Sequence, residues 1–556
     1  MKDSKRFRWL MHQSKYSIRV LWIIPLVCIV SSFCHIGISM IFKGYMDIAS
    51  SESSMSFVQM TIFSITVIVV FALTNIASSV LEGYSYSKIE KGIRTSLIEK
   101  IVQKYLLAIN KMHTAEIQNR LTSDVATISD FFNQLFGQMT LCIFTSVFAI
   151  IFLFILNWKI TLLFLILIPL LTLLITVFSP KLQKAAEIDS KNEDANRSYM
   201  QEVLTLLPLF QVYSMGKNIR NYTQYLYDKK KASKVKLSFL EGSFGFLNSL
   251  TSFGIFIITS AVGAYFVVKG ENTVGDLVAM IQLSNYIMIP LTEAPKFLAT
   301  YNSTLNSVKR IREIENIDNR NVVKQEDKLP LSIDSINLNH LSFEYEAGKP
   351  ILSDISAVFP KDKIIGIIGK SGNGKSTLIK LILGLYIPEN REMIEMRKDG
   401  ESQNYYNYKG IASYVPSENF VFSGTIKDNI CMSRLFEKDK FERACKAANI
   451  DQLVSSFELK EKEEIKESGN NLSMGQKQRL AIARAIYADT SVIILDEPTA
   501  NLDIESINLF KEAIQNLSKG KICIIVTHDN NIASICDTVY RLEKKNLTLL
   551  EKGGNL

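Results

Sequence analysis

The chain has 556 residues, too many for a single core and enough for two or three domains. It is 47% hydrophobic and 21% charged, an average that conceals a first half of long apolar runs and a second half of mixed composition. The net charge of +8 is not accompanied by a basic and aromatic patch, so we expect no nucleic-acid partner. The seven cysteines form no C-x-x-C pair, which argues against a zinc site or a disulfide framework.

The first 305 residues predict a membrane domain. A helix rises about 1.5 Å per residue, so crossing ~30 Å of hydrocarbon takes about 20 apolar residues. Six runs meet this requirement, near residues 18–42, 56–82, 131–156, 159–180, 243–268 and 274–304. The third and fourth are joined only by NWK (157–159), which predicts a tight hairpin. Glu293 and Lys296 interrupt the sixth run and are spaced to pair on a helix, either as a functional pair or as charges near the cytosolic end.

The distribution of positive charge predicts the orientation of these spans. The long connections 83–130 and 181–240 carry seven and eleven Lys and Arg residues, whereas the short connections carry one each. By the positive-inside rule, the N-terminus, both long loops and the second half of the chain lie in the cytosol. Residues 1–17 are either an interfacial helix, with Phe7 and Trp9 at the membrane surface, or a frayed basic terminus. The apolar spacing within the first long loop predicts helices that extend beyond the bilayer, with a loop tip that reaches a soluble domain.

The second half predicts a phosphate-binding α/β domain. GKSGNGKST matches G-x-x-x-x-G-K-[ST] between a buried strand and a helix, the context in which backbone N–H groups and a helix N-terminus hold phosphate. Lys375 is expected to reach the β- and γ-phosphates, and Ser376 to ligate Mg²⁺. The predicted nucleotide-binding residues of this loop are Gly369, Lys370, Ser371, Gly372, Asn373, Gly374, Lys375, Ser376 and Thr377.

Two later segments supply acid–base chemistry. Residues 491–503, SVIILDEPTANLD, form a buried strand that ends in two carboxylates. Asp496 is placed to hold Mg²⁺, and Glu497 suits a general base for the water that attacks the γ-phosphate. His528 ends a third strand, IIVTHD, and is expected at the same edge of the sheet as the phosphate loop and Asp496.

In this order the motifs resemble those of an ATP-binding cassette (ABC) transporter, and residues 18–545 resemble an exporter-type half-transporter. That resemblance implies a segment 1–17, an all-α six-helix transmembrane domain (18–310) with long cytosolic helical extensions, a linker (311–334) and an α/β P-loop ATPase domain (335–556). It implies that Tyr345 stacks on adenine. Two ATPase domains would pair head to tail, so that the signature residues Ser473 and Gly475 contact the γ-phosphate held by the opposite subunit. Gln476 and Asp503 are further expected nucleotide-binding residues.

Two positions depart from the family pattern. Met474 replaces a signature glycine and adds a side chain close to phosphate. Ser417 stands where the family has a glutamine that links Mg²⁺ and the attacking water to the membrane domain, and it would reach the metal only through water or a loop shift. The pattern fits one half of a heterodimer, or a homodimer that tolerates both changes.

We therefore expect an ATP- and Mg²⁺-dependent ATPase in a bacterial cytoplasmic membrane. It would pair with a second half-transporter and export an amphiphilic, peptide or lipid substrate across the bilayer. An importer with an exporter-type fold, similar to some siderophore systems, and an ATP-gated regulatory membrane protein are the alternatives.

Overall fold

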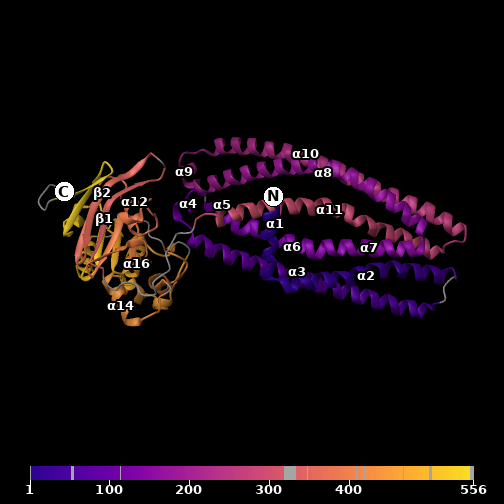
Figure 1. Cartoon of the computed structure of the whole chain (residues 1–556), viewed down its shortest axis with the longest axis horizontal. Coiled ribbons are helices and arrows are strands. Elements are labelled where there is room, and N and C mark those ends of the chain that lie inside the picture. Colours follow the sequence, from indigo (N-terminus) through magenta and orange to yellow (C-terminus); the bar gives the residue numbers. More distant parts are fainter. Residues whose placement is uncertain are drawn as a thin grey trace. The chain divides into compact units, whose positions relative to one another are not determined.

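The computed structural model describes residues 2–550, apart from residues 52–54, 113, 319–332, 347, 408–409, 418–420, 433, 467–468 and 500–503. The chain divides into two compact units. Unit 1 comprises Met1–Val102 and Met112–Asn316, and unit 2 comprises Gln103–Lys111 and Ile317–Leu556. Figure 1 shows helices throughout the first part of the chain and strands only in its last part, as the sequence predicts.

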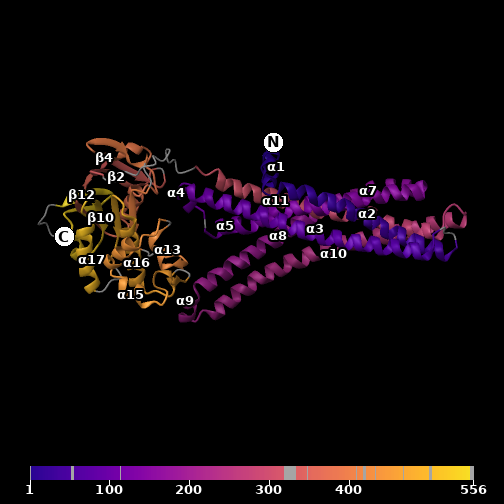
Figure 2. The same ribbon diagram turned by 90° about the horizontal axis from the view of Figure 1, so that it is seen from below.

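Unit 1 consists of helices, several of them much longer than a bilayer crossing. In Figures 1 and 2, α8 and α10 run side by side and α9 joins them at one end. Residues 120–124 and 134–138 are π-helical segments at either end of α6. The helices are α1 (Lys2–His12), α2 (Ile18–Ala49), α3 (Phe57–Gln103), α5 (Thr114–Asn119), α6 (Val125–Asn133), α7 (Met139–Leu156), α8 (Trp158–Thr205), α9 (Leu207–Val212), α10 (Gly216–Val268) and α11 (Val274–Glu315).

Four of the described helical stretches are long and apolar enough to cross a membrane: Ile18–Ala49, Phe57–Gln103, Glu116–Leu156 and Gly216–Val268. They contain four of the six expected spans. The span expected at 159–180 falls in α8, where the side chains of residues 167–179 lie outside the described residues. The span expected at 274–304 falls in α11, whose apolar stretch Val274–Pro290 stops before the two charges that interrupt it.

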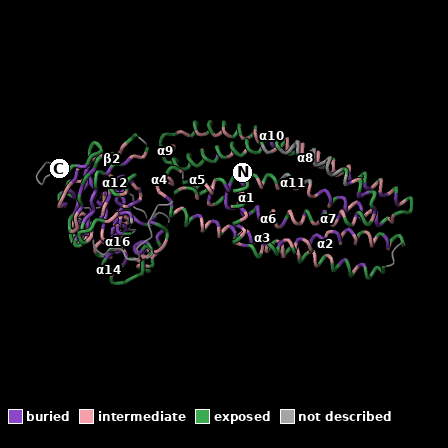
Figure 3. The backbone as a smooth tube through the Cα atoms, viewed as in Figure 1, coloured by how far each residue is buried: buried purple, intermediate pink, exposed green. Residues whose placement is uncertain are grey.

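The apolar surface of unit 1 is outward-facing. Figure 3 shows exposed residues along most helices of this unit, while buried residues concentrate in the sheets of unit 2. Trp22, Ile62 and Val80 are 67%, 61% and 65% exposed. Large apolar side chains on this scale suit contact with lipid, which is as apolar as they are.

The expected hairpin between the third and fourth spans is tighter than its three-residue sequence suggests. α7 ends at Leu156 and α8 begins at Trp158, so Asn157 alone separates them. Its side-chain oxygen accepts hydrogen bonds from the N–H groups of Lys159 (3.0 Å) and Ile160 (3.2 Å), satisfying two of the free donors that begin a helix.

Glu293 and Lys296 do pair, as their spacing predicts. The Lys296 ammonium lies 2.6 Å from one carboxylate oxygen of Glu293, and the other oxygen accepts a hydrogen bond from Gln138 at 3.0 Å. The basic N-terminal residues also form a helix rather than a frayed end. In α1, Leu10 is fully buried and the Trp9 indole donates to the Glu315 carboxylate at 2.9 Å.

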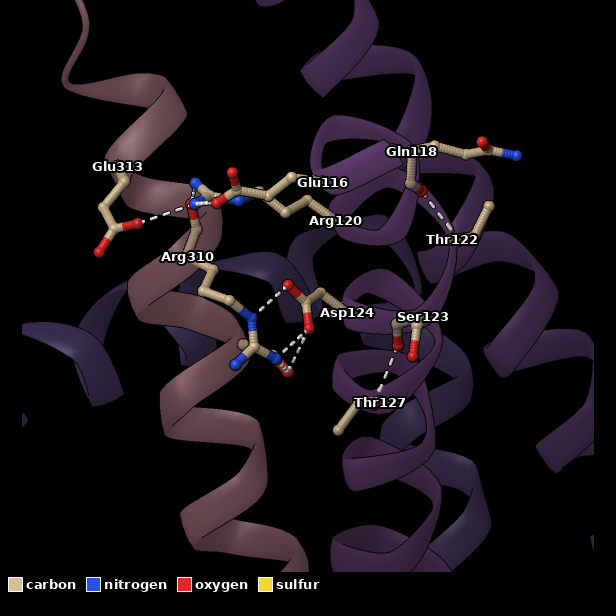
Figure 4. A network of polar contacts seen from close by, with 10 residues as sticks. Glu116, Gln118, Arg120, Thr122, Ser123, Asp124, Thr127, Arg310 and Glu313 are labelled. Carbon is tan, nitrogen blue, oxygen red and sulfur yellow. Dashed lines mark hydrogen bonds and ion pairs between the residues drawn. The ribbon is translucent and has the colours of Figure 1, made fainter. Parts of the chain in front are cut away.

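A buried polar network joins the start of the third span to the end of α11 (Figure 4). The side chains of Arg120 and Asp124 are only 5% and 2% exposed. Arg120 contacts Glu116, Glu313 and the backbone carbonyl of Arg310, and Asp124 accepts from Arg310 and Ser307. Burying these charges is tolerable because each has a charged partner and hydrogen bonds.

Unit 2 has α/β architecture. Its six-stranded sheet has the order β12-β11-β3-β10-β9-β6, a four-stranded antiparallel sheet has the order β2-β1-β4-β5, and β7 pairs with β8. The strands are β1 (Ser335–Glu344), β2 (Pro350–Pro360), β3 (Lys363–Ile368), β4 (Ile394–Lys398), β5 (Glu401–Asn404), β6 (Ala412–Val415), β7 (Gly424–Thr425), β8 (Glu464–Ile465), β9 (Val492–Asp496), β10 (Ile522–Val526), β11 (Thr538–Glu543) and β12 (Asn546–Leu550). The helices are α4 (Leu106–Asn110), α12 (Lys375–Ile382), α13 (Ile426–Cys431), α14 (Lys438–Ala447), α15 (Asp451–Ser456), α16 (Met474–Ala488), α17 (Ile504–Leu517) and α18 (Asn530–Ala533).

The order of the six-stranded sheet brings the predicted chemistry together. β3, β10, β9 and β6 are parallel neighbours. Their carboxyl ends therefore share one edge, the usual place for a ligand in an open α/β sheet. The phosphate loop follows β3, Asp496 ends β9 and His528 follows β10 at this edge.

Candidate functional site

The phosphate loop needs glycine at specific positions. Gly374, which precedes α12, has φ = 99°, a left-handed conformation that side chains disfavour. At Gly369 a Cβ would lie only 2.4 Å from the Leu542 carbonyl oxygen of the neighbouring strand. Asn373 donates to the same carbonyl at 3.0 Å, which ties the loop to β11.

Lys375 folds back over this loop. Its ammonium donates to the carbonyl oxygens of Gly369 (2.6 Å) and Lys370 (3.1 Å). A pocket of about 490 Å³ beside the loop is lined in part by Gly369, Lys370, Asn373 and His528. The loop and the histidine, which are far apart in sequence, therefore line the same pocket.

Tyr345 is held beside the loop by three contacts. Its ring packs edge-on against Phe343 and Tyr386, with centroid separations of 5.3 and 5.8 Å. Its hydroxyl shares a hydrogen bond with Thr377 at 2.8 Å. Burial raises the pKa of Tyr345, so the hydroxyl stays neutral. The aromatic predicted to receive adenine is thus fixed to the first turn of α12.

Asp496 is a buried carboxyl at the end of β9. Burial raises the pKa of Asp496, the hydroxyl of Tyr414 lowers it, and the nearby charge of Glu497 raises it. Tyr414 lies on β6, and its hydroxyl is 3.3 Å from Asp496 Oδ2.

Glu497 has an unusual backbone. Its φ of 50° is left-handed, which is uncommon for a residue with a side chain. Its N–H donates to the Val526 carbonyl at 2.9 Å, and its carboxylate lies 3.1 Å from His528 Nδ1. The turn after β9 therefore brings a carboxylate and an imidazole together, a pair that can accept and pass on a proton.

The predicted signature residues begin helix α16. Ser473 Oγ accepts from the Gln476 N–H at 3.3 Å, and Gln476 Oε1 accepts from the Ser473 N–H at 2.8 Å. This reciprocal pair is a capping box, which fixes the start of the helix. Gly475 lies in the first turn.

Both halves of the chain match known families. Residues 21–291 match the ABC transporter transmembrane region, and residues 352–500 match the ABC transporter family. A putative multidrug export ATP-binding/permease protein of Bacillus subtilis (strain 168) is 27% identical over 485 residues, covering 84% of this chain and 81% of the relative. A multidrug resistance ABC transporter ATP-binding and permease protein of Lactococcus lactis subsp. cremoris (strain MG1363) is 26% identical over 483 residues, with 86% and 81% covered.

A solved structure of a bacterial Atm1-family ABC exporter with ATP bound has the same fold. Its TM-score is 0.78 at 18% identity, over 95% of this chain and 94% of that chain.

The chain belongs to the ABC transporters. It fuses one transmembrane region to one ATP-binding domain and is a half-transporter of the exporter type, which dimerises and couples ATP hydrolysis to transport across a membrane. The predicted family, fold class and transport activity are confirmed. The relatives do not favour the importer or the regulatory protein that the sequence left open.

The two residues that depart from the ABC pattern, Met474 and Ser417, lie in different structural elements. Met474 is the first residue of α16 and is 53% exposed. It is not among the residues with positive φ, so the methionine causes no backbone strain there. Ser417 lies two residues after the end of β6 and is exposed. Asp503 lies outside the described residues, as does Glu418 beside Ser417.

Two polar residues of this site were missed in the sequence. Tyr414 contacts Asp496, and the side-chain amide of Gln478 donates to the Glu497 carbonyl at 3.2 Å. The contact of Tyr414 with Asp496 could not be predicted from the sequence, because it arises only from the pairing of β6 with β9. Gln478 did carry one, because it is a polar residue on an apolar helix face, where a buried amide needs a partner.

Proposed function

We propose that the ATPase domain hydrolyses ATP with Glu497 as the general base. Glu497 would take a proton from the water that attacks the γ-phosphate, while Lys375 and His528 contact the phosphate oxygens. The observation that carries this assignment is the 3.1 Å contact between Glu497 and His528 at the strand edge where the phosphate loop begins. Tyr345 would stack on adenine, and residues 369–377 would enclose the phosphates.

A magnesium ion fits the residues present. Ser376, Asp496 and Ser417 offer hydroxyl and carboxylate oxygens, the hard ligands that Mg²⁺ prefers. Asp496 is buried, and a cation would offset the cost of burying its charge. When bound, Mg²⁺ neutralises charge on the β- and γ-phosphates. Ser376 and Asp496 would bind the ion directly, and Ser417 would act through a water molecule.

The dimer would contain two composite sites. Ser473, Gly475, Gln476 and Asp503 of one subunit would face the nucleotide held by the other. We propose a membrane domain of residues 18–310 and an ATPase domain of residues 335–556, with segment 1–17 at the membrane surface and a linker at 311–334. The excess of Lys and Arg in residues 83–130 and 181–240 supports a cytosolic N-terminus and ATPase domain in a bacterial cytoplasmic membrane.

The proposed substrate is an amphiphile, a peptide or a lipid, moved outward. Two relatives are named for multidrug export or resistance, and one from Lactococcus lactis subsp. lactis is named for lactococcin G processing and transport. The last matches only 51% of this chain, at 34% identity.

The test uses the full chain in inside-out membrane vesicles. Glu497→Gln should retain ATP binding and reduce hydrolysis by ~10²-fold or more, with loss of ATP-dependent uptake of a fluorescent amphiphile. Glu442→Gln, the same change on the exposed surface of α14, is the matched control. Near-normal hydrolysis by the Glu497 variant would remove this residue from the role of base.

A further inference from the structure

Gln478 is a buried amide in an apolar setting. It lies in α16 and is 0% exposed. Leu480, Ala481 and Ile482, which follow Arg479 in the same helix, belong to a buried apolar cluster of unit 2. Burying an amide in such a place costs free energy unless the amide is hydrogen-bonded, so its hydrogen bonds indicate its role.

The amide has one clear partner. Its Nε2 donates to the backbone carbonyl of Glu497 at 3.2 Å. The orientation of the amide follows from chemistry, because a carbonyl only accepts and the Gln478 oxygen cannot take the place of the nitrogen. The Gln478 oxygen has no hydrogen-bond partner among the described residues. Among the described residues, the side-chain amide of Gln478 therefore bonds through its nitrogen to Glu497 and not through its oxygen.

Glu497 is a residue whose backbone needs such support. Its φ of 50° is a conformation that a residue with a side chain keeps only when its surroundings impose it. The N–H group of Glu497 is held by the Val526 carbonyl at 2.9 Å, and its carbonyl is held by Gln478. Contacts on both sides of the α-carbon fix the direction of the side chain, which meets His528.

We propose that Gln478 is a positioning residue for the general base of ATP hydrolysis. By holding the carbonyl of Glu497 it keeps that residue left-handed and keeps its carboxylate directed at His528 and the attacking water. The inference rests on the proposed role of Glu497. Gln478 itself touches neither nucleotide nor water in this role.

The main test is Gln478→Met in the full chain, because methionine has a similar length and shape but cannot donate. Turnover at saturating ATP should fall about 10- to 100-fold, as is usual when the support of a reacting group is removed. Binding of a fluorescent ATP analogue should be unchanged, because the phosphate loop and Tyr345 are untouched. Tyr487→Phe is the control: it removes two other side-chain hydrogen bonds of α16, one to the Leu435 carbonyl and one from the Glu437 N–H, and should leave turnover unchanged.

A double-mutant cycle separates positioning from a general structural role. If Gln478 acts through Glu497, adding Gln478→Met to Glu497→Gln should lower the residual turnover no further. Losses that multiply, or an equal loss in Tyr487→Phe, would overturn the proposal. Should the methionine variant fail to accumulate, Gln478→Asn keeps the polarity but is too short to reach the carbonyl, and it should show the same loss. A large loss in Glu497→Gln with normal turnover in both Gln478 variants would refute this inference alone. Normal turnover in Glu497→Gln would instead refute the role of Glu497.

Discussion

At the scale of single residues, Tyr345 has two chemical features that mutation can separate. Its ring is the proposed face for adenine, and its hydroxyl bonds Thr377. Tyr345→Ala should weaken ATP binding by about 1–3 kcal/mol, the usual value of stacking a base on an aromatic ring. Tyr345→Phe should weaken ATP binding by only about 0.5–1.5 kcal/mol, the value of one hydrogen bond. Titration with a fluorescent ATP analogue measures both, and equal losses would assign the effect to the hydroxyl.

Tyr414 is expected to orient the carboxyl proposed to hold Mg²⁺. Tyr414→Phe removes the donor 3.3 Å from Asp496 and preserves the ring. We expect about a tenfold rise in the Mg²⁺ concentration needed for half-maximal turnover, in line with other groups that orient a metal ligand. Tyr540→Phe, which loses a comparable 3.3 Å bond to the Val358 carbonyl, is the control. An unchanged Mg²⁺ requirement in Tyr414→Phe would leave Tyr414 with a packing role only.

What the sequence reveals at this scale depends on how local the contact is. The phosphate loop was predictable because strand, glycines, lysine and helix follow one another within one short stretch. The contact of Tyr414 with Asp496 joins residues 82 positions apart, and it depends on the order of strands in the sheet. The left-handed backbone of Glu497 was equally hidden, because glutamate is not one of the residue types, such as glycine, asparagine and aspartate, that usually adopt this conformation.

At the scale of elements, the network of Figure 4 connects the π-helical segment at residues 120–124 with the end of α11. Asp124→Asn would remove the charge that faces Arg310 and weaken two charge-assisted bonds. Arg310 is 42% exposed and can turn to water, so we expect a loss of about 1–3 kcal/mol of stability rather than the larger cost of a fully buried pair. The midpoint of thermal unfolding of the solubilised protein should fall accordingly.

Asp130→Asn is the matched control for this network. Asp130 is exposed, lies six residues further along and accepts one bond from Gln134 at 2.8 Å. The unfolding midpoint should barely change in this variant. Equal shifts in Asp124→Asn and Asp130→Asn would show that the network contributes no special stability.

The helices themselves were largely predictable, because long apolar runs and the charge between them follow from the bilayer. The π-helical segments that interrupt these helices could not be predicted. A π-helical segment has nearly the same composition as the α-helix around it. The apolar spacing within the first long loop therefore gave no sign of the segment at residues 120–124. The hairpin at residues 157–159 was placed correctly, but only the capping bonds of Asn157 show that a single residue makes the turn.

At the scale of the whole molecule, part of the first long loop belongs to the ATP-binding unit. Within that unit the Tyr105 hydroxyl donates to the Ile387 carbonyl at 3.3 Å and accepts from the Ile387 N–H at 3.2 Å. Leu106 and Leu107 of α4 pack against its main apolar cluster. The sequence predicted a loop tip long enough to reach a soluble domain, and residues 103–111 of that loop are part of the ATP-binding unit.

Whether two identical chains or two different ones form the transporter depends on Met474 and Ser417. In a homodimer both composite sites would carry methionine where the family has a glycine next to phosphate. In a heterodimer that change would be confined to one site, while Lys375, Glu497 and His528 serve the other. Two facts weaken the case for the heterodimer: Met474 causes no backbone strain, and Ser417 affects the chain's own nucleotide. Lys375, Glu497 and His528 favour the heterodimer, because they would hydrolyse ATP efficiently only if the signature of the partner subunit is intact.

The decisive measurement is the ATPase rate of the chain purified alone and together with a half-transporter encoded beside it. We expect slow hydrolysis by the chain alone and at least a tenfold increase with the partner, since the partner's signature would complete the site that holds Glu497. Met474→Gly should raise the rate of the chain alone, because it restores close approach to phosphate in both sites. Met200→Gly, which changes another partly exposed helical methionine outside the proposed site, controls for a general effect of the substitution. Rapid hydrolysis by the chain alone, increased by neither the partner nor Met474→Gly, would establish a homodimer in which the methionine side chain turns away from the nucleotide.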